Sequence, residues 1–263
     1  MLLKEAKRRA KKKMTTSDIK RIVLDETDST NNYAKRISDA QKSDVLIIAK
    51  KQTAGRGRTG RSFFSPEGGV YMSLLLHPDS EPLKAEKITI MAAVATARAL
   101  EEVFAVKPFI KWVNDIYIGG KKVCGILTEG VFDPENRKFK YAVLGVGVNL
   151  SFPKGGFPEE IKDVAGAVCD KASDGQKNLF VERFLSGFYD IYQNGSEYMS
   201  EYKRRSNILG KNIEYIKDGE TKHGLAVDIT DGGELAVKDE NEVSYLRSGE
   251  VKILVNSINS TER

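Results

Sequence analysis

The sequence predicts an α/β domain followed by a small all-β domain. Up to about residue 208, apolar runs such as 45–52 and 140–150 alternate with long helical patterns, as in α/β folds. From about residue 209, short strands of alternating polarity follow one another between glycine turns, which is typical of a small β-barrel or sandwich. We therefore predict a basic, disordered tail at 1–18, an α/β domain at 19–208 and a β-domain at 209–263.

Composition places the chain among globular proteins with a real core, because 40% of its 263 residues are hydrophobic and 30% are charged. No apolar run approaches the roughly 20 residues that span a bilayer, and the N-terminus lacks the apolar segment of a signal peptide. Two cysteines, Cys124 and Cys169, fit a reducing cytoplasm. The presence of only two histidines argues against a zinc cluster or a serine–histidine relay.

The net charge of +5 comes from the N-terminus. Residues 4–13 hold seven basic residues and one acidic residue, a net of +6, so the rest of the chain carries −1. Such a tail can contact nucleic acid or a membrane surface, but is more often a disordered, solubilising extension. We favour the extension, and Met14 is a candidate start of translation.

The first third of the chain contains strands that alternate with helices. Asp28, Ser29 and Thr30 are good N-cap residues and open a helix that runs to Ile37. A second helix, from Leu83 to about Phe104, follows Pro82 and has apolar residues on more than one side, so we expect it to pack against a sheet. The predicted strands are 19–27, 45–52 and 69–77.

The middle of the chain predicts a hairpin and a central strand. Residues 109–132 predict a strand, a turn, a hairpin and a further strand. The hairpin is indicated by the Gly119–Gly120 pair, a strong signal for a two-residue turn. Residues 140–150 are apolar nearly throughout and therefore predict a central strand. A long connection at 151–178 precedes two helices, one from Asn178 and one after Gly195.

A glycine–arginine segment at 52–66, QTAGRGRTGRSFFSP, separates two predicted strands. Glycine disfavours both helix and strand, so the segment predicts a flexible loop. Glycines allow a close backbone approach and guanidinium groups neutralise charge, so the loop suits an anionic ligand such as a phosphate. A solvated surface loop and an RNA-binding arginine–glycine segment are the alternatives from this segment alone.

Further polar residues interrupt apolar strands, where burial without partners is costly. Each alone is typical of an exposed or turn position, but together with the loop they predict one site with cations, amides and a carboxylate suited to Mg²⁺. Such a site fits adenylation, in which a carboxylate attacks the α-phosphate of ATP. The sequence has no Walker loop and no Rossmann fingerprint. These polar residues are Gln52, Lys111, Asn114, Asp115, Lys122 and Asn149.

In several ordered blocks the sequence resembles the biotin–protein ligases. The matching blocks are DSTN at 28–31, QTAGRGRTGR at 52–61, FFSP at 63–66, KWVND at 111–115, KKVCGIL at 121–127 and GVGVN at 145–149. The resemblance extends from about residue 20 to the C-terminus. It implies a catalytic domain with a mixed sheet, an SH3-like barrel after it, and biotin, ATP and Mg²⁺ as substrates and cofactor. It also implies two half-reactions: formation of biotinyl-5′-AMP, then transfer to a lysine of a biotin carboxyl carrier protein.

The resemblance also implies roles for individual residues. Ser29, Thr30 and Gln52 match the contacts to the biotin head group, and Asn31 completes that motif. Lys122 matches the lysine between the biotin carboxylate and the α-phosphate. Arg58 and Asp115 join it as catalytic residues, with Asp115 as the Mg²⁺ ligand. The remaining predicted ligand contacts are Gly55, Arg56, Gly57, Arg61, Phe63, Lys111, Trp112, Asn114, Gly125, Gly147 and Asn149.

Two departures from the family pattern matter. Phe63 stands where many members carry Trp, so we expect altered adenine packing. About 20 residues precede the first strand, too few for the winged helix-turn-helix of some members, so we predict a ligase without specific DNA binding. The alternatives are a lipoate or octanoate ligase or transferase of the same fold, or a non-catalytic nucleic-acid-binding protein. The resemblance leaves both a homodimer and a monomer open.

Overall fold

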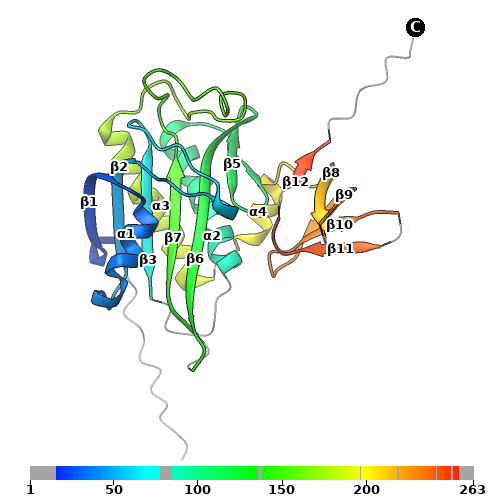
Figure 1. Cartoon of the computed structure of the whole chain (residues 1–263), viewed down its shortest axis with the longest axis horizontal. Helices are drawn as coiled ribbons and strands as arrows, with labels where there is room; N and C mark the ends of the chain where they lie inside the picture. The colour runs from blue at the N-terminus through cyan, green and yellow to red at the C-terminus, as the bar shows by residue number, and fades with distance from the viewer. Residues whose placement is uncertain are drawn as a thin grey trace, which may run out of the picture.

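The computed structural model describes residues 16–77, 85–135, 138–195, 197–217, 219–240, 242–249 and 251–254. These residues form two sheets, one of seven strands and one of five (Figure 1). Most of the predicted basic tail and the predicted helix start at Pro82 and Leu83 lie outside the described residues. Thr16–Asp18 form a short 3₁₀ helix, η1, directly before the first strand.

The larger sheet is mixed, as predicted, with the strand order β1-β2-β3-β7-β6-β5-β4. β1 and β2 are parallel, and every other neighbouring pair is antiparallel. The predicted central strand, β7, is the fourth of the seven, and its neighbour β3 is buried at every position. The strands are β1 (Lys20–Thr27), β2 (Val45–Gln52), β3 (Val70–Leu76), β4 (Phe109–Lys111), β5 (Asp115–Ile118), β6 (Lys121–Asp133) and β7 (Lys138–Val148).

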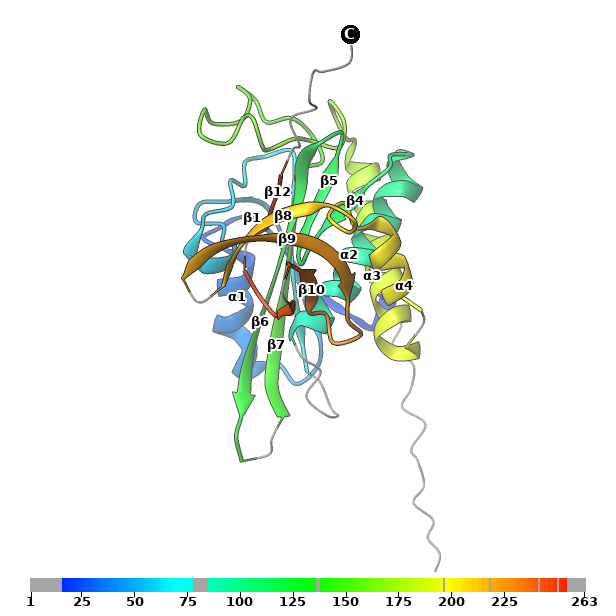
Figure 2. The same ribbon diagram turned by 90° about the vertical axis from the view of Figure 1, so that its right-hand side faces the viewer.

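Helices cover both faces of this sheet (Figure 2). α1 (Thr30–Ile37) packs on one face, where Ala34 contacts a small cluster that includes Leu75. α2 (Ala85–Phe104) and α3 (Asp174–Asn194) cover the other face together with α4 (Met199–Arg205), over the main core. None of the helices in these described ranges is long and apolar enough to cross a membrane.

α3 begins four residues earlier than the sequence pattern predicts. The Ser173 side chain accepts from the backbone N–H of Gln176, whose own side chain accepts from the Ser173 N–H, a capping box. This pair satisfies two backbone donors that the helix leaves open, so the helix extends into the polar residues before Asn178. Between β7 and α3 the chain forms turns and isolated bridges without a helix or strand, as the predicted long connection requires.

The smaller sheet is antiparallel throughout, and its long strand β9 pairs with both β8 and β10. It lies beside α4, at the end of the larger sheet that carries β4 and β5 (Figure 1). The Lys203 ammonium pairs with Asp228 at 2.8 Å, and one hydrophobic core runs through both sheets. Its strands are β8 (Asn212–Lys217), β9 (Glu220–Ile229), β10 (Leu235–Lys238), β11 (Val243–Leu246) and β12 (Val251–Ile253).

Candidate active site

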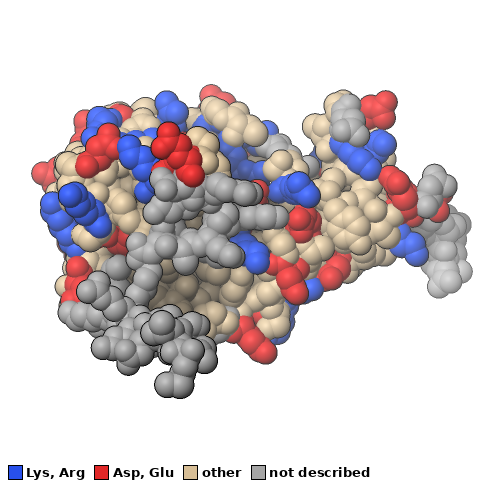
Figure 3. All heavy atoms as spheres, turned by 90° about the horizontal axis from the view of Figure 1, so that it is seen from below, with Lys and Arg blue, Asp and Glu red and all other residues tan. Residues whose placement is uncertain are grey.

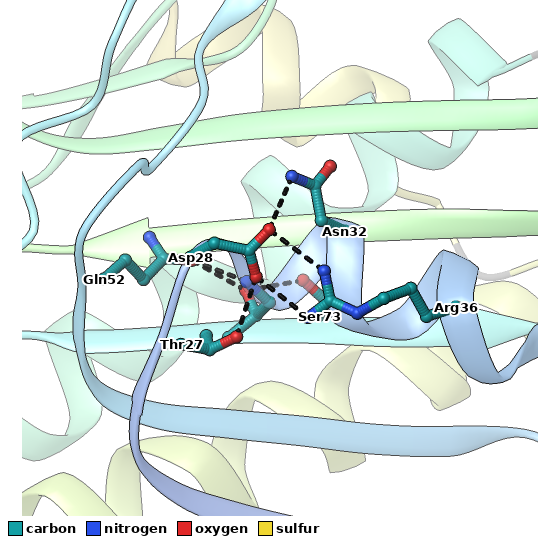
Figure 4. Close-up of polar contacts among 7 residues, drawn as sticks. Thr27, Asp28, Asn32, Arg36, Gln52 and Ser73 are labelled. Atoms are coloured by element: carbon teal, nitrogen blue, oxygen red, sulfur yellow. Dashed lines mark hydrogen bonds and ion pairs between the residues drawn. The ribbon is translucent and has the colours of Figure 1, made fainter.

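The turn between β1 and α1 is fixed by Asp28 (Figure 4). Its carboxylate accepts two hydrogen bonds from the Arg36 guanidinium, at 2.9 and 3.0 Å, one from Asn32 and one from the Thr27 hydroxyl. The Arg36 guanidinium, followed by these smaller contributions, holds the pKa of Asp28 well below its usual range. Ser29 occupies the N-cap position, but its side chain makes no capping hydrogen bond.

The last residue of β2, Gln52, joins this turn to the glycine–arginine loop. Gln52 Oε1 accepts from the Thr30 backbone N–H at 2.8 Å, and Gln52 Nε2 donates to Ser65 Oγ at 2.9 Å. The Ser65 hydroxyl in turn donates to the Phe63 carbonyl oxygen at 2.8 Å. Because each of these hydrogen bonds has one donor and one acceptor, the series fixes which end of the Gln52 amide faces Thr30.

A small polar cavity of about 30 Å³ lies above this turn, with room for little more than water. The Phe63 ring narrows it, because the ring lies against Gly125 of β6 and Gly147 of β7. A Cβ atom at Gly147 would lie 2.7 Å from the ring, so only glycine leaves the ring this position. The cavity is lined by Ser29, Thr30, Asn31, Gln52, Arg56, Phe63, Tyr71, Met72, Gly125, Leu127, Gly145, Val146 and Gly147.

A large cleft of about 730 Å³ adjoins the small cavity. Four residues line both spaces and form the boundary between them: Arg56, Phe63, Gly125 and Leu127. The described residues around the cleft include five basic side chains and one acidic side chain. Those charged residues are Arg56, Arg58, Arg61, Lys111, Lys122 and Asp115, and the C-terminal domain adds Ile216, Ser248, Gly249 and Val251.

Lys122 and Asp115 form the ionic centre of the cleft. Lys122 Nζ lies 2.7 Å from Asp115 Oδ1, and both side chains are mostly buried. They come from the neighbouring strands β6 and β5, where a register shift follows Ile116. Burial, then the nearby Asp115 charge, raises the pKa of Tyr117 to about 12, so this phenol in the cleft wall stays neutral.

Arg58, in the glycine–arginine loop, contacts the wall of the cleft. Its guanidinium donates to Asn114 Oδ1 at 3.2 Å, and Asn114 Nδ2 donates to the Ile126 carbonyl oxygen at 2.8 Å. Asn114 therefore ties the loop to β6. The loop itself has a defined hydrogen-bonded path, since the Gly57 N–H donates to the Arg61 carbonyl oxygen at 2.7 Å.

The structure thus brings nearly all of the predicted site residues around the two adjoining spaces. Gly55 lines neither space. A Cβ atom there would meet the Phe63 carbonyl oxygen and Ser65 Oγ, so Gly55 allows the loop to fold back on itself. Asn149 also lines neither space, since its buried amide donates to the Gly166 carbonyl oxygen at 3.2 Å and supports the long connection.

Several lining or supporting residues were missed by the sequence reasoning. Ser73 is the lone polar residue in the apolar strand VYMSLLL, and Glu129 is the lone acidic residue in KKVCGILTEGVF, so both carried a usable signal. The C-terminal residues Ile216, Ser248 and Gly249 had no such signal, because the pattern of a small β-domain does not say which of its turns faces the cleft.

Comparison with known proteins decides the family. A model of the Biotin/lipoate A/B protein ligase family matches residues 23–149, and a model of the Biotin protein ligase C terminal domain matches residues 208–254. The bifunctional ligase/repressor BirA of Bacillus subtilis is 31% identical over 243 residues, which cover 88% of this chain and 73% of BirA. This chain belongs to the biotin–protein ligase family.

Two further relatives of the family agree. The biotin–[acetyl-CoA-carboxylase] ligase of Paracoccus denitrificans is 29% identical over 82% of this chain and 93% of its own length. The solved biotin protein ligase of Aquifex aeolicus in complex with biotin and ATP superposes with a TM-score of 0.72 at 26% identity, covering 89% of this chain and 98% of that one. The predicted family and fold class are confirmed.

Proposed function

We propose that this chain is an ATP-dependent ligase that activates biotin as biotinyl-5′-AMP and transfers it to a lysine of a biotin carboxyl carrier protein. One observation carries the proposal. A polar cavity, in which Arg56 is the one charged lining residue among those described, adjoins a cleft with five basic side chains, and Lys122 lies in that cleft. This arrangement matches a molecule with a polar, uncharged ring at one end and a carboxylate at the other, reacting with a polyanion.

The small cavity and the cleft would bind different parts of biotin. The ring of biotin carries two N–H donors and one carbonyl oxygen, which suit Thr30, Gln52 and the neighbouring hydroxyls of the small cavity. The carboxylate end then reaches past Gly125 toward Lys122. Since the Phe63 ring lies across Gly125 and Gly147, we infer that the ring is displaced as biotin enters.

In the first half-reaction, a carboxylate oxygen of biotin attacks the α-phosphorus of ATP, and the bond to the leaving pyrophosphate breaks. Lys122 would hold the two anions together, and Asp115 would orient its ammonium group. The three arginines of the loop and Lys111 would offset the negative charge that spreads over the phosphate oxygens.

In the second half-reaction, the neutral amine of the acceptor lysine attacks the acyl carbon of the adenylate. The acyl carbon–oxygen bond breaks, AMP leaves, and the amine loses its proton. The apolar wall formed by Ile126, Leu127 and Val164 would keep water from the mixed anhydride until the carrier docks.

Mg²⁺ fits this cleft as a companion of the triphosphate rather than in a protein cage. No group of three His, Cys, Asp or Glu side chains able to hold a metal occurs within the described ranges. Mg²⁺ is usually bound by one or two carboxylates together with substrate phosphates, and Asp115, beside Asn114, could supply that one carboxylate. The metal would screen the phosphate oxygens.

The small cavity and the surface charge argue against the two alternative functions. A lipoyl or octanoyl chain has no ring N–H donors, so it would make no use of the remaining acceptor capacity of Thr30 and Gln52. On the face in Figure 3, basic and acidic side chains of the described residues lie interspersed, without the single-sign surface typical of a nucleic-acid binder. The absence of specific DNA binding, the carrier partner and a cytoplasmic location stay predictions, and both a homodimer and a monomer stay open.

Exchange of labelled pyrophosphate into ATP tests the proposal. The purified protein is incubated with ATP and Mg²⁺ plus biotin, lipoate, octanoate or no acid. We expect exchange with biotin alone. Exchange with lipoate or octanoate instead would assign the chain to the other branch of the fold, and no exchange with any acid would overturn the proposed chemistry.

A further inference from the structure

Glu129 lies behind the small cavity, on β6, and is linked to α1 by two contacts. The Lys35 ammonium pairs with Glu129 Oε1 at 2.6 Å, and Asn31 Nδ2 donates to Glu129 Oε2 at 2.8 Å. Burial raises the pKa of Glu129, but the hydrogen bonds from Lys35 and Asn31 outweigh burial and place the pKa below its usual value. The carboxylate is therefore ionised at neutral pH and can only accept hydrogen bonds.

An acceptor at this place fixes the orientation of Asn31. Because Glu129 needs a donor, the NH₂ end of the Asn31 amide faces Glu129 and the Oδ1 end faces Ser73, 2.6 Å away. The amide lies against Gly145, where a Cβ atom would collide with Asn31 Oδ1. Both hydrogens of the Asn31 amide are thus directed at protein oxygens, since the second lies 3.5 Å from the Leu127 carbonyl oxygen. The predicted contact of Asn31 with biotin stays a prediction.

The orientation of Asn31 determines the next hydrogen bond. Ser73 is fully buried, and its hydroxyl oxygen lies 2.6 Å from Asn31 Oδ1 and 2.7 Å from Thr30 Oγ1. A hydroxyl has one hydrogen, and the Asn31 oxygen can only accept, so Ser73 donates to Asn31. The 2.7 Å contact with Thr30 Oγ1 then requires the Thr30 hydroxyl to donate to Ser73 in preference to Gln52 Oε1, which is 3.1 Å away. Thr30 then keeps both lone pairs of its oxygen for the cavity.

This direction of the hydrogen bonds also leaves one lone pair free on the Gln52 amide oxygen. Gln52 Oε1 accepts from the Thr30 backbone N–H and lies 3.1 Å from Thr30 Oγ1. With the Thr30 hydrogen on Ser73, one lone pair of Gln52 Oε1 remains for a ligand. If these hydrogen bonds ran in the opposite direction, the Ser73 hydroxyl would donate to Thr30 and occupy one lone pair of its oxygen. The Thr30 hydroxyl would then donate to Gln52 and occupy the remaining lone pair of Gln52 Oε1.

We propose that Glu129 is a positioning residue that sets the direction of the hydrogen bonds through Asn31 and Ser73, so that Thr30 and Gln52 present acceptor oxygens to the N–H groups of the biotin ring. The inference rests on the proposed function, since it concerns recognition in the same cavity. It makes the cavity selective for a ring that donates at two points, and it assigns that selectivity to a carboxylate that does not line the cavity.

A double-mutant cycle tests the direction of these hydrogen bonds. Glu129→Gln keeps the shape of the side chain but offers either an oxygen or an NH₂ group to Asn31, so the direction is no longer enforced. We expect biotin affinity, measured by calorimetry without ATP, to fall about tenfold, while KM for ATP and the Tm stay near wild type. In a Thr30→Val background, which removes the hydroxyl at constant shape, Glu129→Gln should change biotin affinity less than about twofold.

The matched control is Glu26→Gln, because the Glu26–Lys51 pair has the same 2.6 Å length and lies on the surface. It should leave biotin affinity unchanged. Equal losses in both backgrounds, or a parallel loss of ATP binding, would show that Glu129 only supports the fold. If Glu129→Gln fails to fold, Ser73→Ala interrupts the same chain and should couple to Thr30→Val in the same way. Absence of biotin binding by the wild type would instead refute the proposed function.

Discussion

The small cavity is lined by hydroxyls, amides, glycines and a few apolar side chains, with Arg56 as its one charged lining residue among those described, whereas the adjoining cleft has five basic side chains. The difference separates two physical tasks. Neutral donors and acceptors around a small cavity recognise shape and hydrogen-bond pattern, since each unmatched buried group is costly. Cations around a large cleft act on charge that changes during the reaction. Changes in the cleft should therefore reduce turnover, and changes around the cavity should reduce affinity.

The largest expected effect comes from Lys122→Ala. Removing the ammonium leaves Asp115 facing the two reacting anions, so biotin-dependent pyrophosphate exchange should fall by about a thousandfold. Lys121→Ala is the control, because the Lys121 ammonium donates to the Asp163 carbonyl oxygen and lines neither space. A near-normal exchange rate in Lys122→Ala would remove Lys122 from its assigned role.

Asp115→Asn should have the next largest effect. The amide no longer attracts the Lys122 ammonium by charge, so we expect kcat for adenylation to fall about 10- to 100-fold. KM for biotin should stay within about threefold, because Asp115 does not line the small cavity. Steady-state kinetics with biotin as the varied substrate checks this division, and a loss confined to KM would contradict it.

Gly147→Ala tests the cavity side of the comparison. A methyl group 2.7 Å from the Phe63 ring forces the ring to shift and narrows the small cavity, so KM for biotin should rise about tenfold with kcat little changed. Adding Phe63→Ala should recover part of the loss. Gly187→Ala is the control, since a Cβ atom there meets only Ala95 at ordinary distance. Equal effects of the two glycine substitutions would rule out a role for the ring.

The smallest effect concerns the turn that carries Ser29 to Asn31. The folded-state pKa of Asp28 is depressed, so its ion pair with Arg36 stabilises the fold above the unfolded pKa of about 3.9, and this stability is lost as pH falls through the folded pKa. Asp28→Asn should lower the Tm by at most a few degrees at pH 7, because solvent screens the pair, and the difference should shrink below pH 4. Asp25→Asn, which breaks an exposed pair with Lys50, should change the Tm less. A pH-independent difference would contradict the ion-pair explanation.

Much of the fold was predictable, because strands such as 45–52 and the hairpin at Gly119–Gly120 are encoded by local apolar pattern and turn chemistry. The site was predictable where chemistry interrupts that pattern, as at Lys122 and Asp115. Asn149 shows the limit. It ends an apolar strand like a ligand residue, yet its amide serves the long connection, and only the tertiary path of residues 150–173 reveals this.

Trp112 gives the molecule a built-in optical signal. It is the chain's single tryptophan and one of the residues that line the cleft, and its indole N–H donates to the Gly233 carbonyl oxygen of the C-terminal domain at 2.9 Å. Indole emission depends on the polarity and hydrogen bonding around the ring. The intrinsic fluorescence of the unlabelled protein therefore reports on the cleft and on the junction between the two sheets together, so nucleotide entry and separation of the C-terminal domain can both be followed in real time without a dye.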